Sequence, residues 1–324
     1  MLNAHNVLQR AVQSGFASPN TTSTAKLQNV SDFKLTPDFQ TRKLKQLRGT
    51  MAPTHQTVLD FVMSNATFEI SDESFEDINY WFDSLFSDAT PGGSDPYTRA
   101  YAAPTTAEAS PDFMTLQWGQ ADEVWQMQDA SVATLKLSGS NNSGVQVGGS
   151  LIGGQVVAGA LQDLNDRSGT LMNGGMAALA IDVWAGTVGD TAIAASAFSW
   201  ELTINTNRKY RGYLGGYEAA AWNDMPWDGQ LKLSVELNTT TDDYIIAMLA
   251  STNDILERQI EIAYTDGSTG IMQIQFAGHC LAPPQLFEDR DGVMTYDLVF
   301  DAVSNSTLGN WLKIDTTSEI DALV

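Results

Sequence analysis

The sequence has few of the residues that catalytic and metal sites most often use. It contains a single cysteine, Cys280, in a chain of 324 residues. One cysteine excludes an intrachain disulfide framework, and its position in a β-patterned segment predicts a small buried apolar side chain. The histidines, His5, His55 and His279, lie far apart and have no second Cys or His pair that would complete a zinc site. We expect no metal site.

Other catalytic and cofactor motifs are also missing. No Gly-x-Ser-x-Gly elbow occurs, and carboxylate pairs are so frequent that none stands out as a general acid and base. The glycine-rich stretch 139–154 lacks the Gly-Lys-Ser/Thr ending of a phosphate-binding loop. The stretch 163–169 weakly resembles a calcium-binding loop, but Arg167 occupies a position at which such a loop needs an oxygen ligand, so we expect no calcium site there. We therefore expect no cofactor and no enzymatic activity.

Long hydrophobic runs are absent from the sequence. None approaches the roughly 18–20 residues that span a bilayer. The segment Met1–Ser14 lacks the charged-then-apolar pattern of a signal peptide. These observations predict an unprocessed chain outside the membrane.

Basic residues are scarce, with 17 Lys and Arg against 39 Asp and Glu and a formal net charge of −22. The deficit is uneven, because residues 1–48 hold seven basic and two acidic residues, a local +5 that leaves −27 on the rest. An acidic body should repel DNA, since phosphate binding depends on Lys and Arg that release counterions. Acidity also favours solubility by itself. We expect the basic residues to dock on an acidic face of another subunit. The candidate assembly contacts are Arg42, Lys43, Arg48, Arg208, Lys209 and Arg211.

A strand–turn–helix unit occupies residues 48–88. The apolar run Val58–Ile70 predicts a strand, and Ser71 is placed to cap a following helix that ends at Phe86. The apolar residues of this helix recur at three and four residues. They are Phe75, Ile78, Phe82, Leu85 and Phe86, with Glu76, Asp77, Asn79 and Asp83 on the opposite face.

The same unit recurs in the second half of the chain. An alternating strand over Leu231–Leu237 is followed by Thr240–Asp243, which opens a short helix that continues to Leu249. The recurrence predicts a tandem duplication, with the alternative of two unlike β modules that share an element order. We predict a mainly β (α+β) fold with two tandem β-sandwich or barrel domains, at 31–190 and 196–324, each with one amphipathic helix.

Two further segments carry specific expectations. Residues 1–30 are polar and predict an N-terminal arm that becomes ordered only against a neighbouring subunit, with a short helix at Val7–Val12. Residues 88–112 contain four prolines among small residues and predict a long irregular loop that contacts a partner.

The order of these features resembles the major tail tube proteins of long-tailed bacteriophages, in particular the larger, tandem-domain type. The resemblance covers residues 31–314. It is carried by Arg48-Gly49 with Ala52-Pro53, the strand and helix to Phe86, Asp112–Leu116, Val132–Gly139, Ser150–Gly153, Asp291–Phe300 and Asn310–Ile314.

The resemblance implies a virion structural protein that is made in the host bacterial cytoplasm and does not contact a membrane. Six tube domains, each of two packed antiparallel sheets and one helix, would form a ring, and stacked rings would form the tail conduit. DNA and the tape measure protein would pass through its lumen without tight binding, and tail terminator and distal tail proteins would be further partners. An acidic lumen fits this role because it repels phosphates.

Two alternatives stay open at the level of sequence. Eight tryptophans and nine tyrosines in a β-rich chain also fit a receptor- or carbohydrate-binding β-sandwich. For the ring, two domains per chain predict a trimer that presents six tube domains. The alternative is a hexamer in which one domain per chain lines the lumen.

Overall fold

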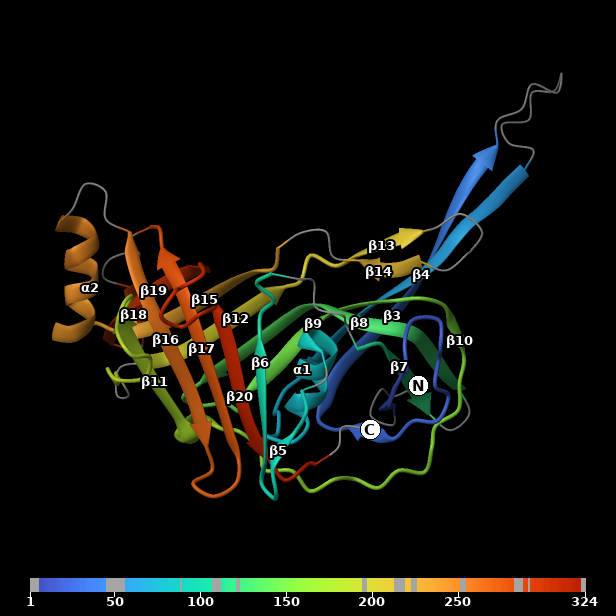
Figure 1. Ribbon diagram of the computed structural model, residues 1–324, viewed down its shortest axis with the longest axis horizontal. Coiled ribbons are helices and arrows are strands. Elements are labelled where there is room, and N and C mark those ends of the chain that lie inside the picture. The colour runs from blue at the N-terminus through green and yellow to red at the C-terminus, as the bar shows by residue number, and fades with distance from the viewer. Residues whose placement is uncertain are drawn as a thin grey trace.

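The computed structural model describes residues 6–44, 56–87, 89–106, 112–120, 123–193, 197–212, 219–222, 226–250, 255–282, 288–290 and 292–321. Within them lie two α-helices, and the rest of the regular structure is almost all antiparallel β-sheet (Figure 1). The prediction of a mainly β fold is confirmed.

The elements divide into two series that follow the same order along the chain. The first contains β1 (Val7–Val12), β3 (Val30–Leu44), β4 (Gln56–Ile70), α1 (Ile78–Phe86), β7 (Met114–Gln120), β8 (Glu123–Ser140), β9 (Gln146–Gly153) and β10 (Val156–Ala158). The second contains β11 (Ala177–Val183), β12 (Ala197–Asn205), β15 (Asp228–Glu236), α2 (Thr239–Ala250), β16 (Leu256–Thr265), β17 (Ile271–Cys280), β19 (Val293–Ala302) and β20 (Leu312–Ser318).

The hydrogen-bonded pairings of the first series recur in the second. Strands β1–β7, β3–β4 and β4–β9 pair in the first series as β11–β16, β12–β15 and β15–β19 do in the second. Likewise β7–β8, β8–β9 and β8–β10 correspond to β16–β17, β17–β19 and β17–β20. Each helix lies between the corresponding strands, so the two series share one topology.

The two series are joined in one sheet at β8 and β12. Seven residue pairs run from Ser199↔Ser140 to Asn205↔Thr134. A second connection is made by β6 (Tyr97–Ala102), which lies between α1 and β7 in the sequence and pairs with β20 of the second series. The domain boundaries at residues 190 and 196 stay a prediction.

The N-terminal segment differs from the expectation. Residues Val7–Val12 form strand β1 and not a helix, and β1 pairs with β2 (Ala25–Leu27) and β7 of its own chain. Leu8, Ala11 and Leu27 are buried in the core. Four successive residues of β1, Leu8 to Ala11, are buried, and the strand lies between β2 and β7; the spacing of apolar residues within Val7–Val12 does not reveal either partner.

Helix α1 begins later than predicted and is covered on all sides. It starts at Ile78, after a turn in which Ser74 Oγ accepts a hydrogen bond from the Asp77 N–H (3.0 Å), so the expected cap at Ser71 is wrong. All nine residues of the helix are buried, including the polar Asn79 and Asp83. Tyr101 on β6 donates to Asp83 Oδ1 (2.8 Å) and thereby satisfies part of the polar face that the sequence places opposite the apolar stripe.

Helix α2 confirms the second predicted helix and has a side-chain cap. The Thr241 N–H donates to Asn238 Oδ1 (3.1 Å), and the Asn238 N–H donates to Thr241 Oγ1 (2.9 Å). This reciprocal pair satisfies donors that a helix start leaves without intrahelical partners. Tyr244 and Met248 face the chain and are buried.

The segment after α1 is more regular than expected. Residues 92–93 form the short strand β5 and residues 97–102 form β6, which pairs with β20 from Ser318↔Tyr97 to Lys313↔Ala102. The prediction of an irregular loop over 88–112 is therefore wrong for these strands. Residues 97–102 are extended because they form backbone hydrogen bonds to the edge of β20, which is far away in sequence.

The core lies between the sheets and the buried helix. Phe68 of β4 stacks on Trp81 of α1 with ring centroids 3.9 Å apart, and Trp200 Nε1 donates to the Tyr264 hydroxyl (2.9 Å). Burying such aromatic side chains contributes much of the apolar area of a core. Cys280 is also buried and free, as the sequence predicts.

A long hairpin projects from this body. Strand β4 pairs with β9 only over Ser64–Ile70, whereas β3 and β4 continue to pair with each other out to Leu44↔Gln56. We call the outer part, residues 38–44 and 56–63, the arm. In Figure 1 the arm lies at one end of the long axis and α2 lies at the other.

A second, shorter hairpin extends from the second series. It consists of β13 (Lys209–Gly212) and β14 (Ala219–Trp222), which lie between β12 and β15 as the arm lies between the inner parts of β3 and β4. The remaining short elements are β18 (Glu288–Arg290), which pairs with β19, and a 3₁₀ turn at Gly174–Met176. Among the described residues, no helix combines the length and apolarity that crossing a membrane requires.

Candidate functional site

One face of the joined sheet carries polar side chains across six neighbouring strands, β4, β9, β8, β12, β15 and β19. Apolar residues such as Leu137, Leu202 and Leu233 point to the core from the other face. Because side chains alternate along a strand, their neighbours form a surface that we call the polar sheet face. It includes Thr67, Glu69, Gln146, Gly148, Ser150, Thr134, Lys136, Ser138, Ser199, Glu201, Thr203, Gln230, Lys232, Ser234, Asp297 and Asp301.

The polar sheet face continues without a break across the junction of the two series. Ser138 of β8 lies opposite Glu201 of β12, and Glu201 lies opposite Lys232 of β15. Serine, threonine and glutamine occupy most of its positions, so the surface offers short uncharged groups with little reach toward a passing ligand.

The lysines of the polar sheet face are paired. Lys136 Nζ lies 2.7 Å from Glu201 Oε2, and Lys232 Nζ lies 3.6 Å from Glu201 Oε1. Partial burial would raise the pKa of Glu201, but the hydrogen bonds and charges of the two lysines outweigh it and lower that pKa. Both ammonium groups are thus shared with one carboxylate, while Glu69 and Asp297 remain exposed on the same face.

The polar sheet face is hollowed at two places. An open hollow of about 720 Å³ lies over β8, β12, β15 and β19, between Ser138, Glu201 and Asp297. A second hollow of about 360 Å³ lies over β4, β8 and β9, between Glu69, Lys136 and Gln146. Both are lined largely by hydroxyl, amide and glycine groups, which suits a smooth concave wall better than a specific binding pocket.

Strands β3 and β18 lie at edges of this sheet in the described part of the chain. In the part of the chain that the structure describes, β3 pairs with β4 alone and β18 pairs with β19 alone. The corresponding edge of β12 is paired with β8. Exposed edges of this kind are templates for pairing with another chain.

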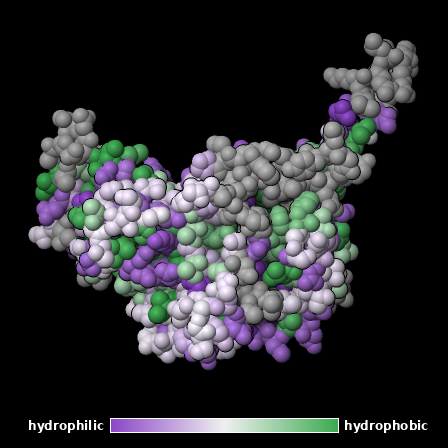
Figure 2. Space-filling model, in the orientation of Figure 1, coloured by the Kyte–Doolittle hydropathy of each residue, from purple (hydrophilic) through white to green (hydrophobic). Residues whose placement is uncertain are grey.

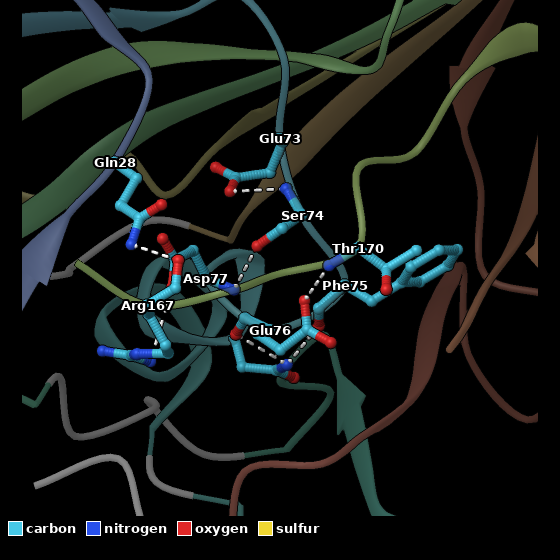
Figure 3. Close-up of polar contacts among 9 residues, drawn as sticks. Gln28, Glu73, Ser74, Phe75, Glu76, Asp77, Arg167 and Thr170 are labelled. Atoms are coloured by element: carbon cyan, nitrogen blue, oxygen red, sulfur yellow. Dashed lines mark hydrogen bonds and ion pairs between the residues drawn. The ribbon is translucent and has the colours of Figure 1, made fainter. Parts of the chain in front are cut away.

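A buried acidic cluster at the start of α1 is the other concentration of titratable groups (Figure 3). Glu73, Glu76 and Asp77 are each buried. Loss of hydration raises the pKa of all three, and most strongly that of Glu73, to which the charge of Asp77 adds. Shifted carboxylates are a common mark of catalytic sites, so the cluster is a test of the expectation that the chain has no enzymatic site.

The contacts of the cluster point to a structural role. Glu76 Oε2 accepts the Thr170 N–H (3.0 Å), and Asp77 Oδ1 lies 3.4 Å from Arg167. Glu73 Oε1 accepts the Ser74 N–H (3.0 Å). The carboxylates of Glu76 and Asp77 therefore hold the extended segment 159–173 against the start of α1 (Figure 3), and none of the three acidic residues lines either hollow of the polar sheet face.

The predicted assembly contacts lie in different environments. Arg42 and Lys43 are exposed on the arm, where Arg42 lies 3.5 Å from Asp60 of the neighbouring strand. Lys209 is exposed at the start of β13. Arg48 and the side chain of Arg211 lie outside the described residues. The role of these residues in assembly stays a prediction.

Arg208 is placed inside the chain. Its guanidinium donates to the carbonyl oxygens of Ser84 (3.2 Å) and Leu85 (2.7 Å) at the end of α1. It also donates to Ser131 Oγ and to the Val132 carbonyl oxygen, both at 2.9 Å. Basic side chains often satisfy the last carbonyls of a helix, but sequence gives no sign that a helix more than a hundred residues away is the acceptor.

The comparisons with known proteins agree with the geometry. A family model described as "Phage tail tube protein" matches residues 5–302. The chain belongs to the phage tail tube protein family, whose members are structural proteins of the virion tail. No curated protein matches the sequence.

Proposed function

We propose that the protein is the major tail tube subunit and that the polar sheet face lines the lumen of the tube. The observation that carries the proposal is the continuity of this face across the β8–β12 junction. A wall built from six strands of one chain can extend around a ring if each junction between chains repeats the junction within the chain.

The chemistry of the face suits the passage of DNA. Its two lysines are shared with Glu201, so they are poorly placed to hold phosphates, and Glu69 and Asp297 add negative charge. Affinity for DNA comes mainly from basic groups that displace counterions, and this face offers none that is unpaired among those described above. DNA and a tape measure protein would slide along it without tight binding.

The repeated topology supports a trimeric ring. Each chain supplies two series with the same pairings, and within the described residues β3 and β18 each have one paired side, at the places where β12 and the end of β8 are paired on both. If β3 of one chain pairs with β18 of the next, three chains present six equivalent tube domains, as closed symmetry favours. The alternative is a hexamer with one lumen-lining domain per chain.

Stacked rings would then form the conduit in the virion tail. Tail terminator and distal tail proteins would contact its two ends, and the chain would be synthesised in the cytoplasm of the bacterial host. Arg42, Lys43, Lys209 and, from sequence alone, Arg48 and Arg211 are the basic residues proposed to contact acidic surfaces of other subunits.

Electron microscopy and sedimentation of the purified protein test this proposal. We expect tubes at high concentration, with threefold symmetry in ring projections and a smallest assembled species of three times the 35.1 kDa chain mass. A ring of six chains would overturn the trimer, and a compact monomer at every concentration and salt would overturn the tube.

A charge reversal tests the lumen. Asp297→Lys would place an unpaired ammonium group on the polar sheet face, and tubes of this variant should retain a short DNA oligonucleotide that wild-type tubes release. Asp163→Lys, exposed on the extended segment 159–173, is the matched control and should behave like wild type. Equal retention by both variants would contradict the assignment of the lumen face.

A further inference from the structure

Helix α2 has more apolar surface than its own chain covers. Every residue of 244–250 is apolar, which is the composition of a helix buried on more than one side. Tyr244 and Met248 are 8% and 9% exposed, but Ile246 on the outer side is 53% exposed. The start of the helix is acidic, with Asp242 and Asp243. On the outer side of α2, Ile246 is therefore an exposed apolar side chain beside negative charge.

An apolar groove lies at the opposite end of the molecule, at the base of the arm. Its volume is about 410 Å³, within the roughly 300–1,000 Å³ of ordinary binding pockets. The groove is lined by Leu35, Pro37, Phe39, Trp118, Trp125 and Val156. Phe39 is 59% and Trp125 48% exposed. Figure 2 shows hydrophobic surface both beside α2 and below the arm.

The two ends also carry opposite charge. Residues 38–63, which include the whole arm, hold four basic and two acidic residues, a local net charge of +2 in a chain of net charge −22. Arg42 of this segment is 65% exposed. Opposite charges beside matching apolar surfaces favour contact between different ends of two copies, which is the head-to-tail geometry that closes rings.

The chain contains an internal template for such a contact. Helix α1, the counterpart of α2, ends against the base of the β13–β14 hairpin, the counterpart of the arm. Phe86 of α1 lies 5.4 Å from the Trp227 ring, and Arg208 donates to the last carbonyls of α1 while it lies 5.5 Å from the same ring. A helix of one series thus packs on the hairpin base of the next series along the chain.

We infer that α2 of one copy packs into the groove at the base of the arm of a neighbouring copy, as α1 packs on the β13–β14 base within the chain. Ile246 enters the groove beside Phe39 and Trp125, and Asp242 and Asp243 face the basic arm. The inference rests on the proposed tube function, because it names the contact through which copies associate.

Cysteine crosslinking tests the contact directly. Phe39→Cys and Ile246→Cys are prepared separately, mixed and treated with a short bis-maleimide; the native Cys280 is 1% exposed and serves as an internal blank. We expect a crosslinked dimer in the mixture and none in either variant alone. Ile271→Cys, 40% exposed on the β16–β17 hairpin, replaces Ile246→Cys in the control mixture and should give no dimer.

Serine variants measure the contribution of each side. Trp125→Ser and Ile246→Ser should each raise the concentration needed for assembly by about tenfold or more, as for central anchors of an interface, whereas Ile271→Ser should not. Unchanged thermal unfolding of the monomers shows that folding is intact. The inferred contact would be wrong if tubes form but residues 39 and 246 do not crosslink, or if Phe39→Cys alone gives a crosslinked dimer. Either result would not contradict the proposed tube function. A wild-type chain that never assembles would overturn both.

Discussion

The two helices occupy corresponding places in the two series, yet their own chain covers them differently. All residues of α1 are buried, and Arg208 and Trp227 of the second series close its C-terminal end. Helix α2 exposes Ile246, at the end of the molecule opposite the arm. The helix of the first unit is thus covered by the second unit, and we propose that a neighbouring copy covers the helix of the second unit.

The largest effect that would test this comparison is a truncation inside α1. Phe82 is fully buried against the core, and Phe82→Ala should lower the free energy of unfolding by about 3–5 kcal/mol, through lost apolar burial and the cavity left behind. Urea unfolding at a concentration where the chain is monomeric measures it. Ile246→Ala on α2 is the control and should cost less than about 0.5 kcal/mol, as for exposed positions. Equal costs would mean that the helices are equally covered.

A change at the clamp of α1 should have the next largest effect. Arg208→Ala would leave the carbonyl oxygens of Ser84, Leu85 and Val132 without this donor in a buried place, which should cost about 2–3 kcal/mol. Lys209→Ala removes a neighbouring exposed charge and should leave the urea midpoint nearly unchanged. If Arg208→Ala changed the urea midpoint as little as Lys209→Ala does, the hydrogen bonds of Arg208 to the end of α1 would contribute little to stability.

The buried acidic cluster should make stability depend on pH. Burial raises the pKa of Glu73 in the folded chain, so its contribution is fully present below the ordinary carboxyl pKa and is lost as the pH rises through the raised value. Glu73→Gln should therefore raise the urea midpoint at pH 8 and change it least near pH 4. Glu69→Gln, at an exposed position, is the matched control for the loss of one carboxylate. A Glu73→Gln variant that is destabilised at pH 8 would contradict this account.

The smallest expected effect is on the polar sheet face. The pKa of Glu201 is lowered by Lys136 and Lys232 despite partial burial, so its stabilising contribution is present at neutral pH and lost as the pH falls through the lowered value. The lysines are about half exposed, and Glu201→Gln should cost less than about 1 kcal/mol at pH 7. Thr203→Val on the same strand is a control that leaves the ion pairs in place. A larger cost would give these pairs a structural role beyond a polar wall.

Local patterns in the sequence predicted the elements that depend on local physics. The alternation of apolar residues predicted strands β15 and β19, and the spacing of apolar residues around Phe82 predicted that α1 packs on the core. The acidic balance and the family resemblance pointed to a tail tube protein, and the family match confirms that prediction.

Predictions failed where a distant strand determined the local conformation. Strand β1 forms because β7 offers a paired edge more than a hundred residues away, and β6 forms because β20 does. The polar side of α1 is buried because Tyr101 of β6 reaches Asp83. None of these partners is visible from the spacing of residues within the segment itself.

By itself, the sequence determined the class of fold, the presence of the two helices and the separation of basic and acidic charge, because these follow from side-chain periodicity and composition. Tertiary structure alone decided that Arg208 clamps α1 and that the polar residues of six strands form one face. It also decided that Ile246 of α2 stays exposed. The reason is physical: periodicity gives each side chain a face within its own element, but only the packing of elements fixes what that face meets.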